Sequence, residues 1–192
     1  MANPDIVRGL YPVANAYSGS YTGGARVYTV PAGDATAIFI GDPVKLVGTS
    51  QTVGGQVYAD IAQAATGDVM VGVVVGVLAD VATSTIYRAA STLRRVLVCD
   101  DPNALFEIQE VSGGTALTAN DIGLNANFVV GSGSTFTGYS GVELNNATEA
   151  GTNTLDLKIM GLVPSEDNAI GENAKWIVRI NRHQYVNQIA GV

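Results

Sequence analysis

The chain has 192 residues, a length that fits one globular domain with a tail or a small second lobe, and 47% of them are hydrophobic, which excludes wholesale disorder. Only 14% are charged and 23 are glycines, a composition typical of β-rich proteins with many turns rather than of helical bundles. Ten basic against 17 acidic residues give a net charge of −7, which argues against nucleic-acid binding because phosphate contacts need basic side chains.

The first 24 residues differ from the rest of the chain. Prolines and glycines interrupt any regular period, so we expect neither a helix nor a central strand there. Two interpretations are open: a coil packed along its own domain, or an extended arm (residues 1–24) that docks on another subunit or a partner. The second predicts a set of residues at an interface with a partner or another subunit: Ile6, Arg8, Leu10, Tyr11, Tyr17 and Tyr21. Tyrosine suits docking, because it offers a large apolar area and a hydroxyl at little rotamer cost.

From Ala25 onward the pattern is one of short strands and turns. The segments expected as strands in the first half are rich in β-branched residues and end at Gly, Pro or Asp: 26–30, 37–40, 44–47, 57–64, 86–88 and 96–99. The most apolar run, residues 69–78, covers about half of a ~20-residue membrane span and fits one or two buried strands. We find no secretion signal and no membrane segment, so we expect the protein to stay where it is made.

The second half is more clearly patterned. Phe106 and Ile108 alternate with polar neighbours, and residues 118–122 fit a single helical turn. Residues 154–160 predict a strand with Asp156 facing away from the core, and residues 175–181 predict one with Trp176 facing the core. The fold class expected is all-β: a single β-sandwich or barrel-like domain over residues 25–192, with an extended N-terminal arm and at most short helical turns.

Few residues could carry out catalysis or bind a metal. His183 is the only histidine and follows a strand, where a solvated polar corner is expected; Cys99 is the only cysteine and fits a buried small hydrophobe. The acidic pairs at 100–101 and 166–167 lie in turns without the spaced carboxylates of a calcium loop. No phosphate loop or nucleophile elbow is present. We therefore expect no enzyme activity, no cofactor and no metal.

Three segments carry a resemblance to a known family. They are Cys99-Asp-Asp-Pro-Asn-Ala-Leu-Phe-Glu-Ile-Gln109, then Asp121-Ile-Gly-Leu-Asn-Ala-Asn127 with the loop that follows and Ser140-Gly-Val-Glu-Leu144, and Lys158–Asn168 continuing into Trp176–Gln184. Together they cover most of residues 99–184 and resemble the head decoration, or cement, proteins of tailed bacteriophages. The resemblance supplies no catalytic residues.

That resemblance implies a non-enzymatic virion protein, made in the host cytoplasm, that binds the outer capsid surface and clamps neighbouring major capsid subunits. The major capsid protein is then the partner, and closed symmetry favours a homo-oligomer, a trimer before a dimer. The alternative is a glycan- or receptor-binding β module, such as a head-fibre base or an adhesin domain. A hydrolase built on two carboxylates stays open. A major capsid subunit is disfavoured, because such proteins are longer and contain long helices.

Overall fold

The computed structural model describes residues 3–17 and 19–186, and its regular secondary structure is almost entirely strand, which confirms the all-β prediction. The one short helix is η1 (Ala119–Asp121), a 3-10 turn capped by Thr118, whose hydroxyl accepts a hydrogen bond from the N–H of Asn120. It lies in the segment for which the sequence predicts a single helical turn.

Five strands close into a barrel in the order β3-β5-β4-β6-β7, and we call residues 26–99 the barrel unit. Its strands are β3 (Arg26–Val30), β4 (Pro43–Val53), β5 (Gln56–Gln63), β6 (Gly72–Val77) and β7 (Arg94–Cys99). Valines dominate the core of the barrel, where Val30, Val44 and Val98 are among the fully buried side chains. β-branched side chains favour this pleated, packed conformation.

Six strands form an antiparallel sheet in the order β2-β1-β8-β13-β12-β9, with a separate β10–β11 pair beside it. The strands are β1 (Tyr11–Asn15), β2 (Gly19–Ser20), β8 (Ala104–Gln109), β9 (Asn125–Ala126), β10 (Phe128–Val129), β11 (Glu143–Leu144), β12 (Leu157–Leu162) and β13 (Lys175–Ile180). Residues 3–24 and 100–186 make up this sheet unit. Trp176, Val178 and Ile180 face its core as predicted.

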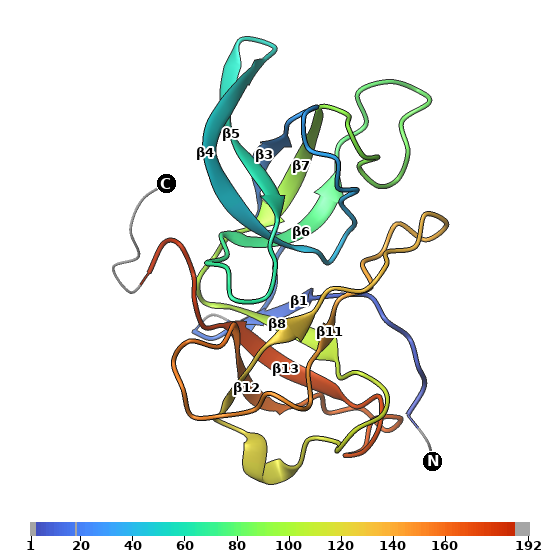
Figure 1. Ribbon diagram of the computed structural model, residues 1–192, viewed down its shortest axis with the longest axis vertical. Helices are drawn as coiled ribbons and strands as arrows, with labels where there is room; N and C mark the ends of the chain where they lie inside the picture. Colours follow the sequence, from blue (N-terminus) through green and yellow to red (C-terminus); the bar gives the residue numbers. More distant parts are fainter. Residues whose placement is uncertain (1–2, 18, 187–192) are drawn as a thin grey trace.

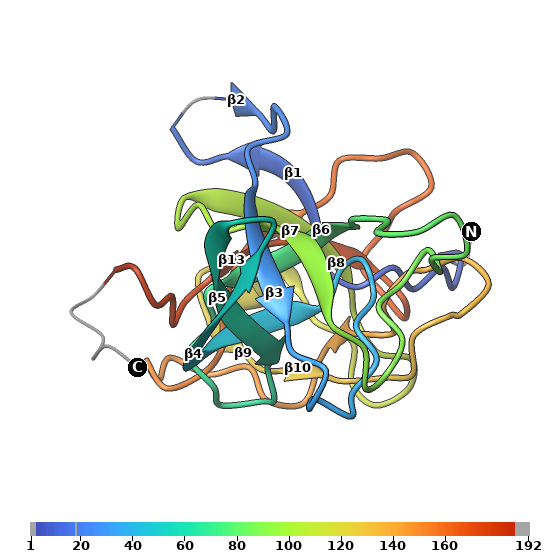
Figure 2. The same ribbon diagram turned by 90° about the horizontal axis from the view of Figure 1, so that it is seen from above.

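In the sequence the barrel unit is therefore inserted between β2 and β8 of the sheet unit, and the two units lie one above the other (Figure 1; Figure 2 shows them from the barrel end). The core of the sheet unit extends into the barrel unit through Ala64, Met70 and Val73. The N–H of Leu10 also donates to the carbonyl of Gly41 at 3.0 Å. The described residues thus form two hydrophobic cores that pack directly on each other.

The N-terminal segment differs most from the expectation. Tyr11–Asn15 form β1 between β2 and β8, although we expected no central strand here. The proline is tolerated because the register of β1 against β8 shifts between Pro12 and Ala14, and a β-bulge is one of the few places where a sheet accepts proline. Leu10 and Tyr21 of this segment pack on the core of their own chain, and docking of its exposed residues on a partner stays a prediction.

Two of the expected strands are reduced to isolated bridges. Ile38 pairs with Arg88, and Ile40 pairs with Tyr139, without extending into ladders. Three distant segments of the chain are thereby tied together, and they form the surface described next.

Candidate interaction surface

Three segments without regular secondary structure lie side by side on one flank of the molecule: residues 36–41, 78–93 and 131–141. We call them the loop surface. Ile38 and Arg88 exchange both backbone hydrogen bonds, at 2.8 and 2.9 Å. Ile40 donates to the carbonyl of Gly138 at 2.9 Å and accepts from Ser140 at 2.8 Å. Residues 36–41 therefore connect residues 78–93, the long barrel loop, to residues 131–141, the sheet-unit loop. Both loops project on the same side in Figure 1.

Close side-chain packing holds the three segments in place. The rings of Phe39 and Tyr87 stack with centroids 4.9 Å apart. A Cβ at position 133 would lie 2.3 Å from the Phe39 ring, so only glycine fits there. Gly138 has φ of +76° and faces Ile86, whose side chain would lie 3.1 Å from a Cβ at that position. The conformation of residues 131–141 depends on both glycines.

Arg88 fixes the residues under the long barrel loop. Its side chain is fully buried, and its guanidinium donates to four backbone carbonyls: those of Thr92 at 2.8 Å, Pro31 at 2.7 Å, Asp34 at 2.9 Å, and Thr36. Burial lowers the pKa of Arg88 from its ordinary value, with the nearby Asp34 acting in the opposite direction. A planar guanidinium that spans several carbonyls orders the turn at 31–36 and the loop at 88–92 together.

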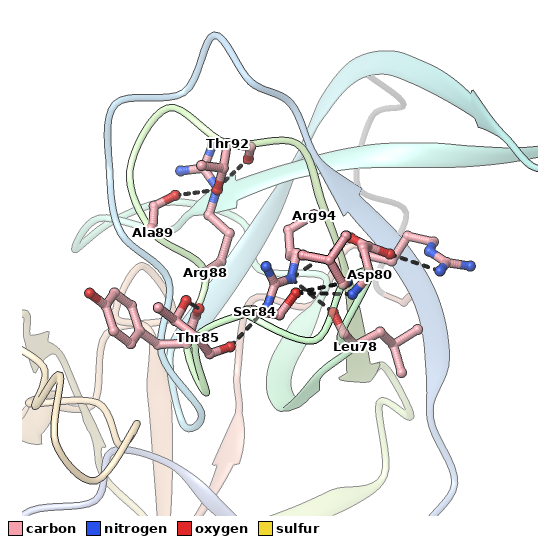
Figure 3. A network of polar contacts seen from close by, with 11 residues as sticks. Leu78, Asp80, Ser84, Thr85, Arg88, Ala89, Thr92 and Arg94 are labelled. Carbon is pink, nitrogen blue, oxygen red and sulfur yellow. Dashed lines mark hydrogen bonds and ion pairs between the residues drawn. The ribbon is translucent and has the colours of Figure 1, made fainter.

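Arg94 plays the same part at the other end of that loop (Figure 3). Its side chain donates to the carbonyls of Leu78 and Thr85, each at 2.8 Å. Asp80 lies 3.8 Å from Arg94 and forms a 2.8 Å ion pair with Arg95. The loop is therefore held at both ends by arginine side chains from the barrel unit itself.

The loop surface exposes large apolar side chains to solvent. Phe136 is 91% exposed, Val81 63% and Ile86 54%. Asp80 and Arg88 are the only charged residues in the three segments, and Arg88 is buried while Asp80 is paired. Apolar groups on a surface that is already ordered lose little conformational freedom on binding, so this arrangement suits a protein–protein contact.

Of the six residues predicted at an interface, two pack in the core of the sheet unit, three are exposed, and Arg8 forms an ion pair. Leu10 is buried in the core of the sheet unit, so it is a packing residue and not a surface contact. Tyr21 packs against the same core and donates its hydroxyl to the carbonyl of Gly24 at 2.9 Å. Ile6, Tyr11 and Tyr17 are exposed.

Arg8 forms a 3.0 Å ion pair with Glu107 of β8 and lies over the ring of Tyr11, 5.1 Å from its centroid. A cleft of about 150 Å³ lies at the junction of the units. It is lined by Arg8, Tyr11, Leu10 and Tyr21, and by Val74 of β6. The structure thus brings four of the six residues around one small cleft, while Ile6 and Tyr17 lie outside it.

A larger cleft, of about 350 Å³, lies on the other side of Tyr21 and is polar. Asn15, Arg26, Asp100 and Asp101 contribute to its lining. Arg26 and Asp100 form a 2.6 Å ion pair, and Asp101 accepts a hydrogen bond from Asn15. Its polar groups are largely engaged with one another.

Cys99 and His183, the only cysteine and histidine of the sequence, are both buried. Cys99 is buried, and burial raises its pKa to about 11, as expected of a small hydrophobe. His183 is not in a solvated corner, which corrects the sequence expectation: it is fully buried, and burial lowers its pKa to about 4. Its Nδ1 accepts a 3.2 Å hydrogen bond from the N–H of Tyr185. Within residues 3–17 and 19–186, no group of three or more His, Cys, Asp and Glu is arranged to hold a metal ion.

Sequence reasoning missed the loop surface. Each segment alone reads as an ordinary loop, and the exposed residues become a surface only when the bridges to Ile38 and Ile40 bring the loops together. One signal was present in the sequence: residues 131–141 contain no charge and place Phe136 among glycines, serines and threonines, where nothing local can bury it.

No protein-family model matches the chain, and no curated protein or solved structure is significantly similar to it. In the part of the chain that the structure describes, no helix is both long and apolar enough to cross a membrane.

Proposed function

We propose that this protein is a non-enzymatic structural protein of a phage virion, which binds the outer surface of the capsid and clamps neighbouring major capsid subunits. The resemblance of residues 99–184 to head decoration proteins suggests this class. The observation that carries the proposal is the loop surface. It presents Ile86 and Val81 on a loop held by Arg88 and Arg94, and Phe136 on a loop held by backbone pairing with Ile40.

The loop surface matches what such a protein requires. A cement protein binds many identical sites on an already assembled shell, so its contact surface must be in place before it binds. An exposed phenylalanine on a surface with few charges is an anchor suited to a pocket on the partner. The contact is made mainly by apolar burial, and we therefore expect it to depend weakly on salt.

The test compares two matched substitutions in the full chain. Ile86→Ser removes an apolar contact from the loop surface, and Ile170→Ser makes the same change at a residue of similar exposure, 50% against 54%, in the β12–β13 connection. We expect Ile86→Ser and Phe136→Ser to weaken binding to expanded capsid shells by at least about tenfold, a loss of ~1.4 kcal/mol or more. Ile170→Ser is expected to bind like the wild type. Equal binding by all variants would remove the loop surface from the interface.

The polar cleft supports the alternative function, a glycan- or receptor-binding module. It combines an aromatic residue, Tyr21, with the carboxylates Asp100 and Asp101, groups that together recognise sugar faces and hydroxyls. Saturable binding of a soluble oligosaccharide that Asp101→Asn abolishes, without any shell binding, would favour this alternative over the capsid role.

A further inference from the structure

The β4–β5 hairpin extends beyond the barrel and forms one extremity of the molecule (Figure 1). Its strands pair from Ser50↔Ala59 to Val53↔Gln56, and Gly54 and Gly55 form the turn with φ of +60° and +82°. Positive φ at both central residues defines the two-residue turn that matches the natural twist of a hairpin. The tip is therefore a regular hairpin and not an irregular loop.

A buried carboxylate fixes the base of this hairpin. Asp60 of β5 is fully buried and accepts hydrogen bonds from Thr29 at 2.8 Å, Thr49 at 2.7 Å and Gln51 at 3.2 Å. These donors come from β3 and from the residues on either side of Ser50, where the bulge in β4 ends. The hairpin is thereby held at a set angle to the barrel.

The outer edge of β4 is open along most of its length. On this outer edge, β4 pairs with β6 only through Pro43 and Val44. From Lys45 to Val53 the opposite edge of β4 faces β5, and no strand among the described residues pairs with the outer edge. In a hairpin closed by a two-residue turn, Val53 and Gln56 form the hydrogen-bonded pair next to the turn. The alternation of an antiparallel ladder then directs the N–H and C=O groups of Thr52 and Ser50 outward, away from β5.

Beyond its bulge, this edge lacks the side chains that usually prevent strand addition. Residues 46–59 contain no charged residue and no proline, although the chain as a whole carries a net charge of −7. Soluble proteins protect open edges with lysines, prolines, inward-pointing charges or bulges. The bulge between Leu46 and Ser50 interrupts the edge, so the segment free to pair is Ser50–Val53.

We propose that Ser50–Val53 of β4 pairs antiparallel with the same segment of a second copy of this chain, forming a continuous β5-β4-β4-β5 sheet across a twofold axis. In this register Gln51 lies on the axis, and the outward N–H and C=O groups of Thr52 lie opposite those of Ser50 in the other copy. Each such pair of residues exchanges two backbone hydrogen bonds, so the two symmetry-related pairs give four. The inference concerns the protein alone and does not depend on capsid binding.

A second copy is the occupant that the observations favour. An antiparallel edge is complementary to itself under twofold rotation, so one segment supplies both halves of an isologous contact. Two chains of charge −7 repel each other over most of their surfaces, and the uncharged hairpin is an element at which they can approach without placing like charges in contact. A twofold dimer also differs from the trimer that the sequence analysis favoured.

The test is the molar mass of the full chain by light scattering and sedimentation over a concentration series. We expect the wild type to reach twice the mass of one chain. Thr52→Pro removes the outward N–H that the dimer needs, whereas an edge strand tolerates proline where its N–H faces solvent. Thr52→Lys places a cation from each copy close to the axis. We expect each variant to weaken dimerisation at least about tenfold.

Thr83→Lys is the matched control, since it makes the same change in charge at an exposed threonine of the 78–93 loop. It is expected to dimerise like the wild type. A wild type that stays monomeric throughout, or a dimer that survives both changes at Thr52, overturns the proposal. Equal weakening by Thr83→Lys would also overturn it, because the effect would then be one of net charge. Circular dichroism establishes that each variant is folded.

Discussion

Arg88 offers a direct test of how the loop surface is held. We consider Arg88→Met, which keeps an unbranched side chain of similar reach and removes every donor. The buried guanidinium of the wild type serves the carbonyls of Thr92, Pro31, Asp34 and Thr36. All four lose that donor in the variant.

The expected cost follows from those four carbonyls. A buried polar group left without a partner costs about 1–3 kcal/mol, but water entering from the loop side satisfies some of them and methionine recovers apolar contacts. Losses of about 3–5 kcal/mol are found when a buried charged network is broken. We therefore expect Arg88→Met to lower the free energy of unfolding by ~3–5 kcal/mol, a large share of a typical total of ~5–15 kcal/mol.

The assay is urea unfolding followed by two probes. Far-UV circular dichroism reports on all strands, while fluorescence of Trp176, the only tryptophan, reports on the core of the sheet unit. Because the two cores pack directly on each other, we expect both midpoints to fall together. Arg95→Met is the control: Arg95 forms an exposed ion pair with Asp80, and we expect a much smaller change. A loss below ~0.5 kcal/mol for Arg88→Met would refute the reasoning.

Three further predictions concern buried groups. Leu10→Ala is expected to lower the free energy of unfolding by ~2–5 kcal/mol in urea titrations, because Leu10 fills the core, and a neutral result would place the N-terminal segment outside it. Burial raises the pKa of Glu110 to about 7 from 4.5, so the contribution of this carboxyl to stability is complete below pH 4.5 and is lost as pH rises through 7. The loss amounts to ~3 kcal/mol, and unfolding measured at pH 5 and pH 8 should differ less in Glu110→Gln than in the wild type; an unchanged difference would contradict the assignment. Cys99, buried and with a raised pKa of about 11, should react with a thiol reagent only after unfolding, and rapid labelling of the native protein would contradict its burial.

Local patterns predict the elements whose environment is set by neighbours in the sequence. β3 has the predicted bounds Arg26–Val30, and the alternation of Trp176, Val178 and Ile180 correctly assigns the core face of β13. In these strands the side-chain period and the β-branched residues favour the same conformation, so the sequence is sufficient.

Local patterns fail where the partner is distant in the chain. Asp156 was expected to face away from the core, yet it is fully buried and accepts a 2.9 Å hydrogen bond from the N–H of Gly67, across the junction of the two units. Pro12 excludes a regular central strand, but the bulge in β1 accommodates it against β8, about ninety residues later.

The same limit applies to the candidate site. The loops that carry Phe136 and Ile86 are far apart in the sequence, and they lie on one surface only because residues 36–41 pair with both of them. No periodicity predicts that pairing, and only the low charge of these segments indicates a surface.

Co-sedimentation tests the proposed binding of this protein to an assembled shell. Purified wild-type protein is mixed with expanded capsid shells and, in parallel, with unassembled major capsid subunits, and the pelleted ratio is measured as the protein is titrated. We expect saturation at a fixed ratio of this protein to the shell subunit. A protein that stays in the supernatant at every concentration, with shells shown to be intact, would contradict it.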